Sequence, residues 1–158
     1  YQKAIALSPK SAYIYNNIGS VKKKMGDLEG AKAAYNKAVQ ADAKYHIALN
    51  NLGSILYEQK KYKEALDVFN QSIKLKNNYA LAYNNRGSVH FKMEKYKDAE
   101  KDFTKALKLQ PDYADALVNR GSAREMIRNQ VGACEDWKKA RELGSSQGKK
   151  YHVNNCNN

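Results

Sequence analysis

Asparagine recurs at a fixed spacing along this chain, in a pattern suited to binding a peptide backbone. Its side chain offers both a carbonyl acceptor and an NH₂ donor, so it can pair with the C=O and the N–H of one peptide unit. Asparagines at one position of successive repeats would form a ladder for an extended segment. The main series is Asn17, Asn51, Asn85 and Asn119, spaced by 34 residues, and in three of these places another asparagine comes directly before, at Asn16, Asn50 and Asn84.

The histidines give little support to catalysis or metal binding. His46, His90 and His152 lack partners at the spacing of a metal site or a catalytic triad, and no glycine-rich loop could cradle a phosphate. His90 falls at an inward-facing position, where core packing is its expected role. We therefore expect no catalytic residue, no cofactor and no metal site.

The elements that position the asparagines repeat with the same period. Glycine recurs at 34-residue intervals, and four other positions keep the same phase around it. The glycines are Gly19, Gly53, Gly87 and Gly121, and the accompanying sets are Tyr15, Leu49, Tyr83 and Leu117; Ala31, Ala65, Ala99 and Ala133; Tyr35, Phe69, Phe103 and Trp137; and Ala38, Ser72, Ala106 and Ala140.

This pattern resembles the tetratricopeptide repeat, whose period and order of small and aromatic residues it matches over residues 1 to about 144. The resemblance implies an all-α fold, a right-handed α-solenoid of stacked antiparallel helix pairs. Each pair would bury its apolar face against its neighbours rather than in a single core. The first helix of each pair would lie on the inner, concave wall.

The repeat divides the chain into four full units and two end segments. The units are residues 12–45, 46–79, 80–113 and 114–144. Residues 1–11 are expected to be part of the second helix of a preceding repeat, so the chain reads as a fragment cut within that repeat. Residues 145–158 are expected to form a short capping helix and a polar tail, with Ser145 as the N-cap.

The face of each first helix opposite its core stripe is the expected ligand surface. It runs through positions 2, 5, 6, 9 and 12 or 13 of the unit, and it is rich in amide and hydroxyl groups. Besides the asparagines above, the expected peptide-binding residues are Ser20, Ser54 and Ser88, with Tyr13, Lys24, Glu58 and Lys92 at the flanks giving sequence preference.

The asparagine ladder resembles the one in the tetratricopeptide superhelix of O-linked N-acetylglucosamine transferases, where asparagines hold substrate backbone. A second known type, the two-carboxylate clamp for chaperone C-termini, needs lysine at position 5 and asparagine at position 9. This chain has asparagine and serine there, as at Asn16 and Ser20, so the clamp is absent. The alternative role for the asparagines at position 6 is to join adjacent repeats by hydrogen bonds.

Arginine replaces the usual apolar residue at position 7 of the last two units, and aspartate accompanies it at position 23. The first two units have Ile18 and Leu52 at position 7. A guanidinium that faces a partner helix needs a carboxylate, because an unpaired buried charge is costly. We expect structural ion pairs, Arg86 with Asp102 and Arg120 with Asp136; the alternative is that these arginines turn outward and bind an anion.

The closing unit resembles those of bacterial, often cell-envelope, tetratricopeptide proteins, in the stretch from Gly132 to Trp137 and on to Gly144. In such proteins a cysteine like Cys134 often accompanies one near the end of the cap, like Cys156. The two residues suit either a disulfide or two free buried thiols. A bridge would imply an oxidising compartment, which leads us to expect the periplasm or cell envelope.

Composition narrows the class of partner. The net charge of +12 is spread over all four units, which argues against nucleic acid, and no nucleic-acid motif is recognisable. The excess is either a solvated basic exterior or an attraction for an acidic partner. No run approaches the roughly 18 apolar residues of a membrane span.

The sequence thus predicts a non-catalytic module that binds an extended protein or peptide segment in its groove. Two alternatives stay open. The array could be a structural spacer or self-assembly scaffold, with self-association through the open N-terminal end, or it could be the substrate-recognition part of a larger enzyme.

Overall fold

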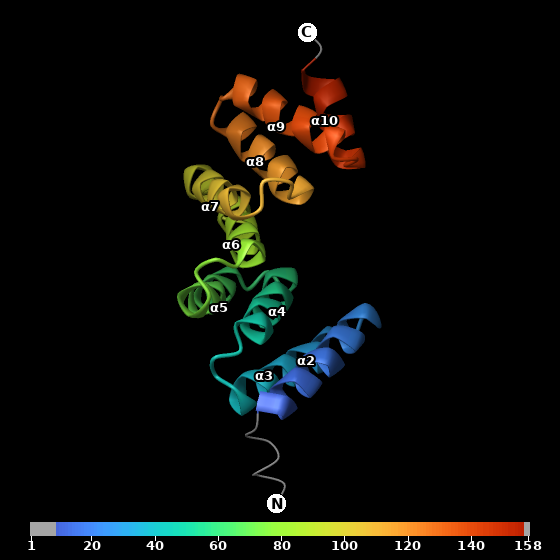
Figure 1. Cartoon of the computed structure of the whole chain (residues 1–158), viewed down its shortest axis with the longest axis vertical. Coiled ribbons are helices and arrows are strands. Elements are labelled where there is room, and N and C mark those ends of the chain that lie inside the picture. Colours follow the sequence, from blue (N-terminus) through green and yellow to red (C-terminus); the bar gives the residue numbers. More distant parts are fainter. Residues whose placement is uncertain (1–8, 157–158) are drawn as a thin grey trace, which may run out of the picture. The chain divides into compact units, whose positions relative to one another are not determined.

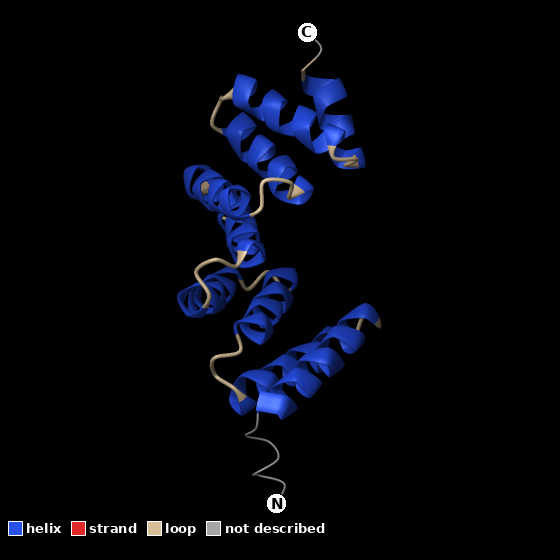
Figure 2. Cartoon of the chain, in the orientation of Figure 1, coloured by secondary structure: helices blue, strands red, loops and turns tan. Residues whose placement is uncertain are grey.

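The computed structural model describes residues 9–156, and this part of the chain is helical throughout, with no strand (Figures 1 and 2). Short turns join the helices in antiparallel pairs. The predicted all-α fold is therefore confirmed. In chain order the helices are α2 (Pro9–Lys24), α3 (Leu28–Ala41), α4 (His46–Glu58), α5 (Tyr62–Leu75), α6 (Ala80–Lys92), α7 (Tyr96–Leu109), α8 (Ala114–Met126), α9 (Gln130–Glu142) and α10 (Ser146–Asn155).

In each pair the two helices are in close contact where a glycine of the first helix faces an aromatic ring of the second. A Cβ built on Gly53 of α4 would lie 2.7 Å from the ring of Phe69 in α5, so only glycine leaves room for the ring. The same contact joins Gly121 of α8 to Trp137 of α9, whose ring is completely buried. The Trp137 indole also donates a hydrogen bond to the Val118 carbonyl (3.2 Å). Close packing of this kind explains why these two positions repeat in phase.

The turns within the four pairs share one left-handed residue. Gly26 has φ of 82°. The residues at the equivalent position of the next three repeats are Lys60, Glu94 and Arg128, and they have φ of 60°, 59° and 63°. Only glycine enters this region without a steric cost. The turn geometry is thus the same in every repeat, although only the first repeat has glycine there.

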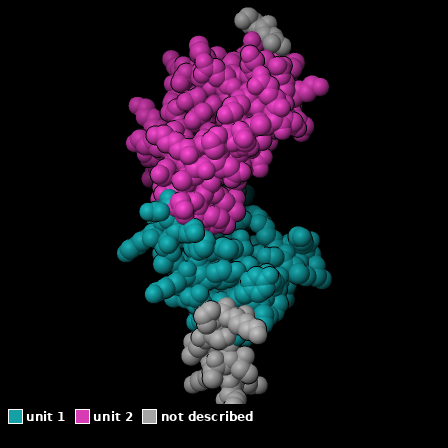
Figure 3. Space-filling model, viewed as in Figure 1, with its two compact units in different colours: residues 1–77 teal, residues 78–158 magenta. Residues whose placement is uncertain are grey.

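The chain forms two compact units, residues 1–77 and 78–158 (Figure 3). In unit 1, α2 packs on α3 and α4 on α5, and α3 joins the two pairs by packing on α4. In unit 2 the pairs are α6 with α7 and α8 with α9, joined by packing of α7 on α8. Helix α10 covers α9 and also contacts α8.

The predicted boundaries need one correction at the N-terminal end. The repeat pattern predicts residues 9–11 as part of a preceding second helix, whereas the structure includes them in α2. Proline is compatible with the first turn of a helix, where its missing N–H has no intrahelical partner in any case. The prediction for residues 1–8 lies outside the described residues. At the other end, α10 begins after Ser145, whose hydroxyl accepts a hydrogen bond from the Gly148 N–H (3.1 Å).

Candidate functional site

The two asparagine series form hydrogen bonds from one repeat to the next. In unit 1 the Asn51 amide donates to Asn16 Oδ1 (2.9 Å), and in unit 2 the Asn119 amide donates to Asn84 Oδ1 (3.0 Å). Each bond links position 6 of one repeat to position 5 of the repeat before it. Within both units, the asparagines therefore join adjacent repeats.

Position 5 does not face a ligand as predicted. The side chains of Asn16, Asn50 and Asn84 are buried, with 6%, 1% and 6% of their surface exposed. The prediction that these three asparagines line the ligand surface is therefore wrong. A buried amide needs hydrogen-bond partners, and the neighbouring repeat supplies one. At position 6, Asn17 is exposed, and Asn51, Asn85 and Asn119 are half-buried.

A tyrosine completes this network in unit 2. Tyr113, just before α8, shares a side-chain hydrogen bond with Asn84. Burial raises the pKa of Tyr113 to about 12, a shift to which Asp115 and Tyr79 contribute and which the Asn84 hydrogen bond partly opposes. The Asn84 side chain thus contacts both Tyr113 and Asn119, so its orientation is fixed from two sides.

The serines at position 9 are engaged mainly with their own helices. Ser20 and Ser88 donate to the carbonyls of Asn16 (3.1 Å) and Asn84 (3.0 Å), four residues earlier. Ser54 instead accepts a hydrogen bond from Lys23 Nζ (2.9 Å). The O–H groups of Ser20 and Ser88 are thus used within their own helices, while their oxygens retain acceptor capacity.

The flanking residues differ in how accessible they are. Tyr13 exposes 60% of its surface, and Lys24 and Lys92 are also exposed. Glu58 is engaged in an ion pair with Lys23 (2.7 Å). A ligand along the first helices would therefore meet an aromatic ring and free ammonium groups more readily than the Glu58 carboxylate.

One exposed apolar surface on α2 was not predicted. Ile14, Ile18 and Val21 lie on one face of this helix, and Met25 follows its end; together with Asn17, Lys22 and Asp27 they border a hollow of about 600 Å³. In α4 and α8 the residues at these positions pack against the preceding second helices, α3 and α7, whereas no helix before α2 is among the described residues.

The arginines at position 7 are paired with the aspartates at position 23. Arg86 binds Asp102 through two hydrogen bonds, Nε to Oδ2 (2.8 Å) and Nη2 to Oδ1 (2.6 Å). Arg120 binds Asp136 in the same way, at 2.9 and 2.6 Å. The hydrogen bond to Asp102 raises the pKa of Arg86. Because the guanidinium groups form these bidentate pairs within the protein, they are not available to bind an anion.

His90 lies beside the first of these pairs. Its Nε2 is 3.7 Å from Asp102 Oδ2, and its Nδ1 is buried without a hydrogen-bond partner in the described part of the chain. Burial lowers the pKa of His90, although Asp102 opposes the shift. The described residues contain no group of three His, Cys, Asp or Glu side chains that could hold a metal ion.

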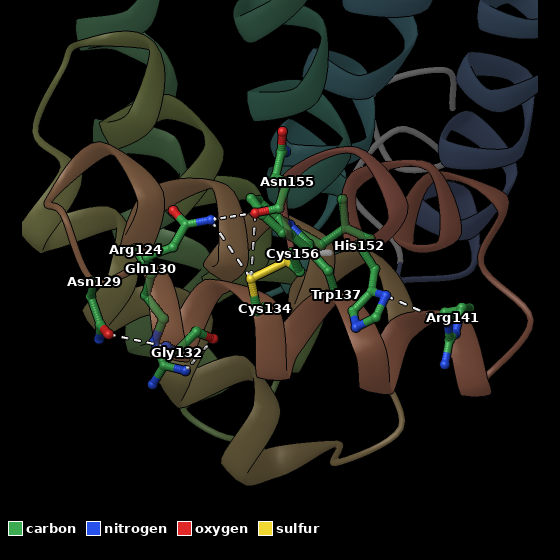
Figure 4. The surroundings of a disulfide bond; sticks show 11 residues. Arg124, Asn129, Gln130, Gly132, Cys134, Trp137, Arg141, His152, Asn155 and Cys156 are labelled. Carbon is green, nitrogen blue, oxygen red and sulfur yellow. Dashed lines mark hydrogen bonds between the residues drawn. A yellow bond between two sulfur atoms is a disulfide. The ribbon is translucent and has the colours of Figure 1, made fainter. Parts of the chain in front are cut away.

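A disulfide fastens the capping helix to the last pair. Cys134 of α9 and Cys156, at the end of α10, are bonded to each other (Figure 4). Beside the bridge, the Gln130 amide donates to the Asn155 carbonyl (2.9 Å), and the rings of Trp137 and Tyr151 pack 5.3 Å apart. The cap is therefore held by a covalent bond, a hydrogen bond and an aromatic contact.

Three family models match the chain and together cover more than half of it. Two, each described as a tetratricopeptide repeat, match residues 12–45 and 80–113, and a third, described as a TPR repeat, matches residues 53–94. The chain belongs to the tetratricopeptide-repeat family. No curated protein sequence matches this tetratricopeptide-repeat chain.

Solved structures with the same all-α solenoid fold include bacterial and peptide-bound tetratricopeptide proteins. A crystal structure of MamA is 25% identical, with a TM-score of 0.77 over 94% of this chain and 87% of that one. PilF of Pseudomonas aeruginosa is 26% identical, with a TM-score of 0.80 over 92% of this chain and 66% of that one. The first tetratricopeptide domain of Spaghetti (RPAP3), bound to the HSP90 peptide SRMEEVD, is 25% identical, with a TM-score of 0.75 over 78% and 98%.

None of the described helices combines the length and the apolar composition needed to cross a bilayer.

Proposed function

We propose that this tetratricopeptide module binds an extended segment of another protein along the exposed faces of its first helices, without catalysis. Membership of the family and the likeness to a peptide-bound relative support a role in protein interaction. The finer proposal is that the asparagines at position 6 hold the backbone of the bound segment. Asn17 and Asn51 would do so in unit 1, and Asn85 and Asn119 in unit 2.

The observation that carries this proposal is the fixed orientation of two of these amides. Asn51 and Asn119 each use one N–H on a buried asparagine of the preceding repeat. Their Oδ1 atoms and second N–H bonds are left for a further partner. An amide held in place before binding loses less conformational entropy when a ligand arrives, which favours affinity. Joining repeats and binding a ligand are thus compatible roles for the same side chain.

Recognition of a peptide backbone, rather than of a terminal carboxylate, also agrees with the absence of lysine at position 5 of the repeats. The relative bound to SRMEEVD holds a peptide with an acidic C-terminal end. The carboxylate clamp needs a lysine at position 5, where this chain has the buried Asn16, Asn50 and Asn84. The cations Lys24 and Lys92 lie instead near the ends of α2 and α6. We therefore propose internal extended segments, rather than C-terminal carboxylates, as the ligand class.

Charge favours segments with acidic residues beside the bound backbone. The chain carries a net charge of +12, and the exposed Lys24 and Lys92 end the same helices, α2 and α6, that carry Asn17 and Asn85. Exposed charges attract a ligand over a distance of about 10 Å at 0.1 M salt and less at higher salt. Binding should accordingly weaken as salt is raised, with a larger effect on acidic peptides than on neutral ones.

Selection from a random 12-residue peptide display library on the full chain tests this proposal. Calorimetry would then compare the selected peptides on the wild type and on Asn51→Ala/Asn119→Ala. We expect the affinity to fall about 10-fold or more, because hydrogen bonds to the peptide backbone are lost at two sites. Circular dichroism should retain its helical signal, since neither residue is in a helix-pair core.

A matched variant separates ligand binding from structural joining. Asn16→Ala/Asn84→Ala removes the buried partners and leaves both position-6 asparagines in place. It should lower the melting temperature at least as much as the first variant, yet retain more of the peptide affinity. If the two variants lose affinity equally, the asparagines only join repeats; if no peptide is selected at all, the scaffold alternative replaces peptide binding.

A further inference from the structure

The capping helix α10 is held on the rest of unit 2 by few non-covalent contacts. Gly148 is the only one of its ten residues that is buried, and it lies close against Ala140 of α9. The Tyr151 ring packs on Trp137, but Val153 leaves 47% of its surface exposed. The helix therefore removes little apolar surface from water, and this burial is the main favourable term when one element docks on another.

The sequence of α10 also forms a helix poorly without neighbours. Isolated helices shorter than about 12–15 residues are marginal in water, and α10 has ten residues. Gly148, Val153 and the two asparagines at its end are all weaker helix formers than alanine. Ser145 supplies a single N-cap hydrogen bond. We therefore expect this segment to stay helical only while it is docked on α9.

The disulfide between Cys134 and Cys156 is the strongest connection between α9 and α10, and it lies at the surface (Figure 4). Both cysteines are half-buried, and they border a hollow of about 380 Å³ whose other side chains include Val131, Lys138 and His152. Val131 exposes 73% of its surface, so the hollow is open to solvent. Exposed disulfides are more easily reduced than buried structural ones. The bridge is therefore accessible to a thiol from solvent.

We propose that this disulfide is a redox-sensitive latch, whose reduction releases α10 from α9 while the helix pairs of unit 2 stay folded. A thiolate of a dithiol reductant attacks one sulfur of the bridge, which forms a mixed disulfide and frees the other cysteine. The second thiolate of the reductant then displaces the remaining cysteine. Two electrons and two protons pass from the reductant to the two cysteines, and the reductant becomes a disulfide. After this step, α10 is joined to α9 covalently only by the backbone at Ser145.

The contacts between α8 and α9 do not depend on α10. The Trp137 ring lies against Gly121 of α8, and its indole donates to the Val118 carbonyl (3.2 Å). Asp136 of α9 forms its bidentate pair with Arg120 of α8. All of these groups belong to the two helices of the last pair. This pair therefore keeps its packing when the cap leaves.

Release of α10 changes the chemistry of the α9 surface. The docked cap presents polar side chains to solvent, among them the exposed Lys149. Without the cap, Ala140 and one face of the Trp137 ring are uncovered, because Gly148 and Tyr151 no longer lie on them. The reduced protein therefore has an apolar surface that the oxidised protein hides, and the redox state of the surroundings decides which of the two is present.

Trp137 is the only tryptophan of the chain, so its fluorescence reports on the cap directly. The measurement compares the oxidised full chain with the same chain treated with dithiothreitol. Reduction should move the emission to longer wavelength, since water reaches the ring when Tyr151 leaves. Amide exchange in Ser146–Asn155 should accelerate about 10-fold or more, while exchange in α8 should change little. Reoxidation should restore both signals.

Two variants separate release of the cap from other effects of reduction. Cys134→Ser/Cys156→Ser should have the emission and exchange of the reduced protein and should not respond to the reductant. Tyr151→Ala removes the ring contact but retains the bridge, so it should shift the emission without accelerating exchange to the reduced level. The proposal is overturned if the serine variant retains the emission and slow exchange of the oxidised protein, because non-covalent contacts then hold the cap. It is also overturned if reduction accelerates exchange in α8 as much as in α10, because the bridge then stabilises the whole unit.

Discussion

The two units have the same helix pairs but different chemistry at equivalent positions of those pairs. In unit 1, positions 7 and 23 hold apolar residues, Leu52 with Val68 in the second repeat. In unit 2 the same positions hold the ion pairs Arg86 with Asp102 and Arg120 with Asp136. The aspartate side chains are 8% and 4% exposed, so these charges lie inside the protein.

Unit 2 satisfies these charges with a network rather than with isolated pairs. Arg124 also donates to Asp136 (3.0 Å), and it reaches Glu100 of the neighbouring pair (2.9 Å). Asp136 thus accepts from two arginines. The repeat fold tolerates either solution, provided that both positions change together. The difference teaches that positions 7 and 23 act as one structural element, and the following predictions test that conclusion.

The largest effect should come from removing the carboxylate at the centre of the network. Asp136→Ala leaves Arg120 and Arg124 without their buried partner, which should cost about 3 kcal/mol or more of unfolding free energy. The apolar counterpart in unit 1, Val68→Ala, should cost only about 1 kcal/mol, because it removes two methyl groups from a half-buried site. Urea unfolding monitored by circular dichroism measures both. Equal losses of unfolding free energy would show that the ion network stabilises the protein no more than the apolar contact does.

The disulfide should rank next, and its effect should be confined to unit 2. Cys134→Ala/Cys156→Ala opens a loop with a sequence separation of 22, for which the chain-entropy estimate is about 3 kcal/mol. Reduction of the wild type should give the same loss. Amide exchange should accelerate first in α10 and leave α2 to α5 unchanged. Faster exchange in unit 1 would contradict a local role for the bridge.

Converting unit 2 to the chemistry of unit 1 should have a smaller effect. Arg86→Ile/Asp102→Ala recreates the pair Ile18 and Ala34 of the first repeat. Replacing a buried ion pair by apolar residues is often neutral or stabilising by about 1 kcal/mol or more, since no charge has to leave water. Thermal and urea unfolding should therefore show no loss. Arg86→Ile alone is the control. It leaves the buried Asp102 carboxylate without its arginine partner and should be clearly destabilising.

The helix pairs and the ion pairs follow from the sequence because they depend on contacts within one repeat. Glycine at position 8 and an aromatic residue at position 24 repeat in phase, and they meet in the structure as Gly53 meets Phe69. Arg86 and Asp102 likewise change together between repeats and form a bidentate pair. Each of these pairs is separated by 16 residues, so the contact is local and is repeated along the chain.

The candidate site was predicted less well because it depends on contacts between repeats. Position 5 lies opposite the core stripe of its own helix, which made Asn16 and Asn84 seem accessible. In the structure, the next repeat covers them and donates a hydrogen bond from Asn51 or Asn119. A helical face drawn for one repeat does not include this neighbour. The exposed face of α2 was missed for the converse reason, since its usual neighbour is absent from the described residues.

The smallest effect concerns a feature in which the two units agree. Lys60 in unit 1 and Glu94 in unit 2 both have a left-handed backbone, like Gly26 in the first repeat. Glycine relieves the steric cost of this conformation, about 1 kcal/mol, but it also raises the entropy of the unfolded chain. Lys60→Gly and Glu94→Gly should each stabilise the protein by about 0.5 kcal/mol, measured by thermal unfolding.

The reverse change provides the control. Gly26→Ala adds a Cβ that meets no other atom within 4 Å, so any loss of stability must come from the backbone conformation alone. It should cost about 1 kcal/mol. Agreement between Lys60→Gly and Glu94→Gly would show that the turn is equivalent in the two units although their buried positions differ. A gain in one unit only would extend the difference between the units from their cores to their turns.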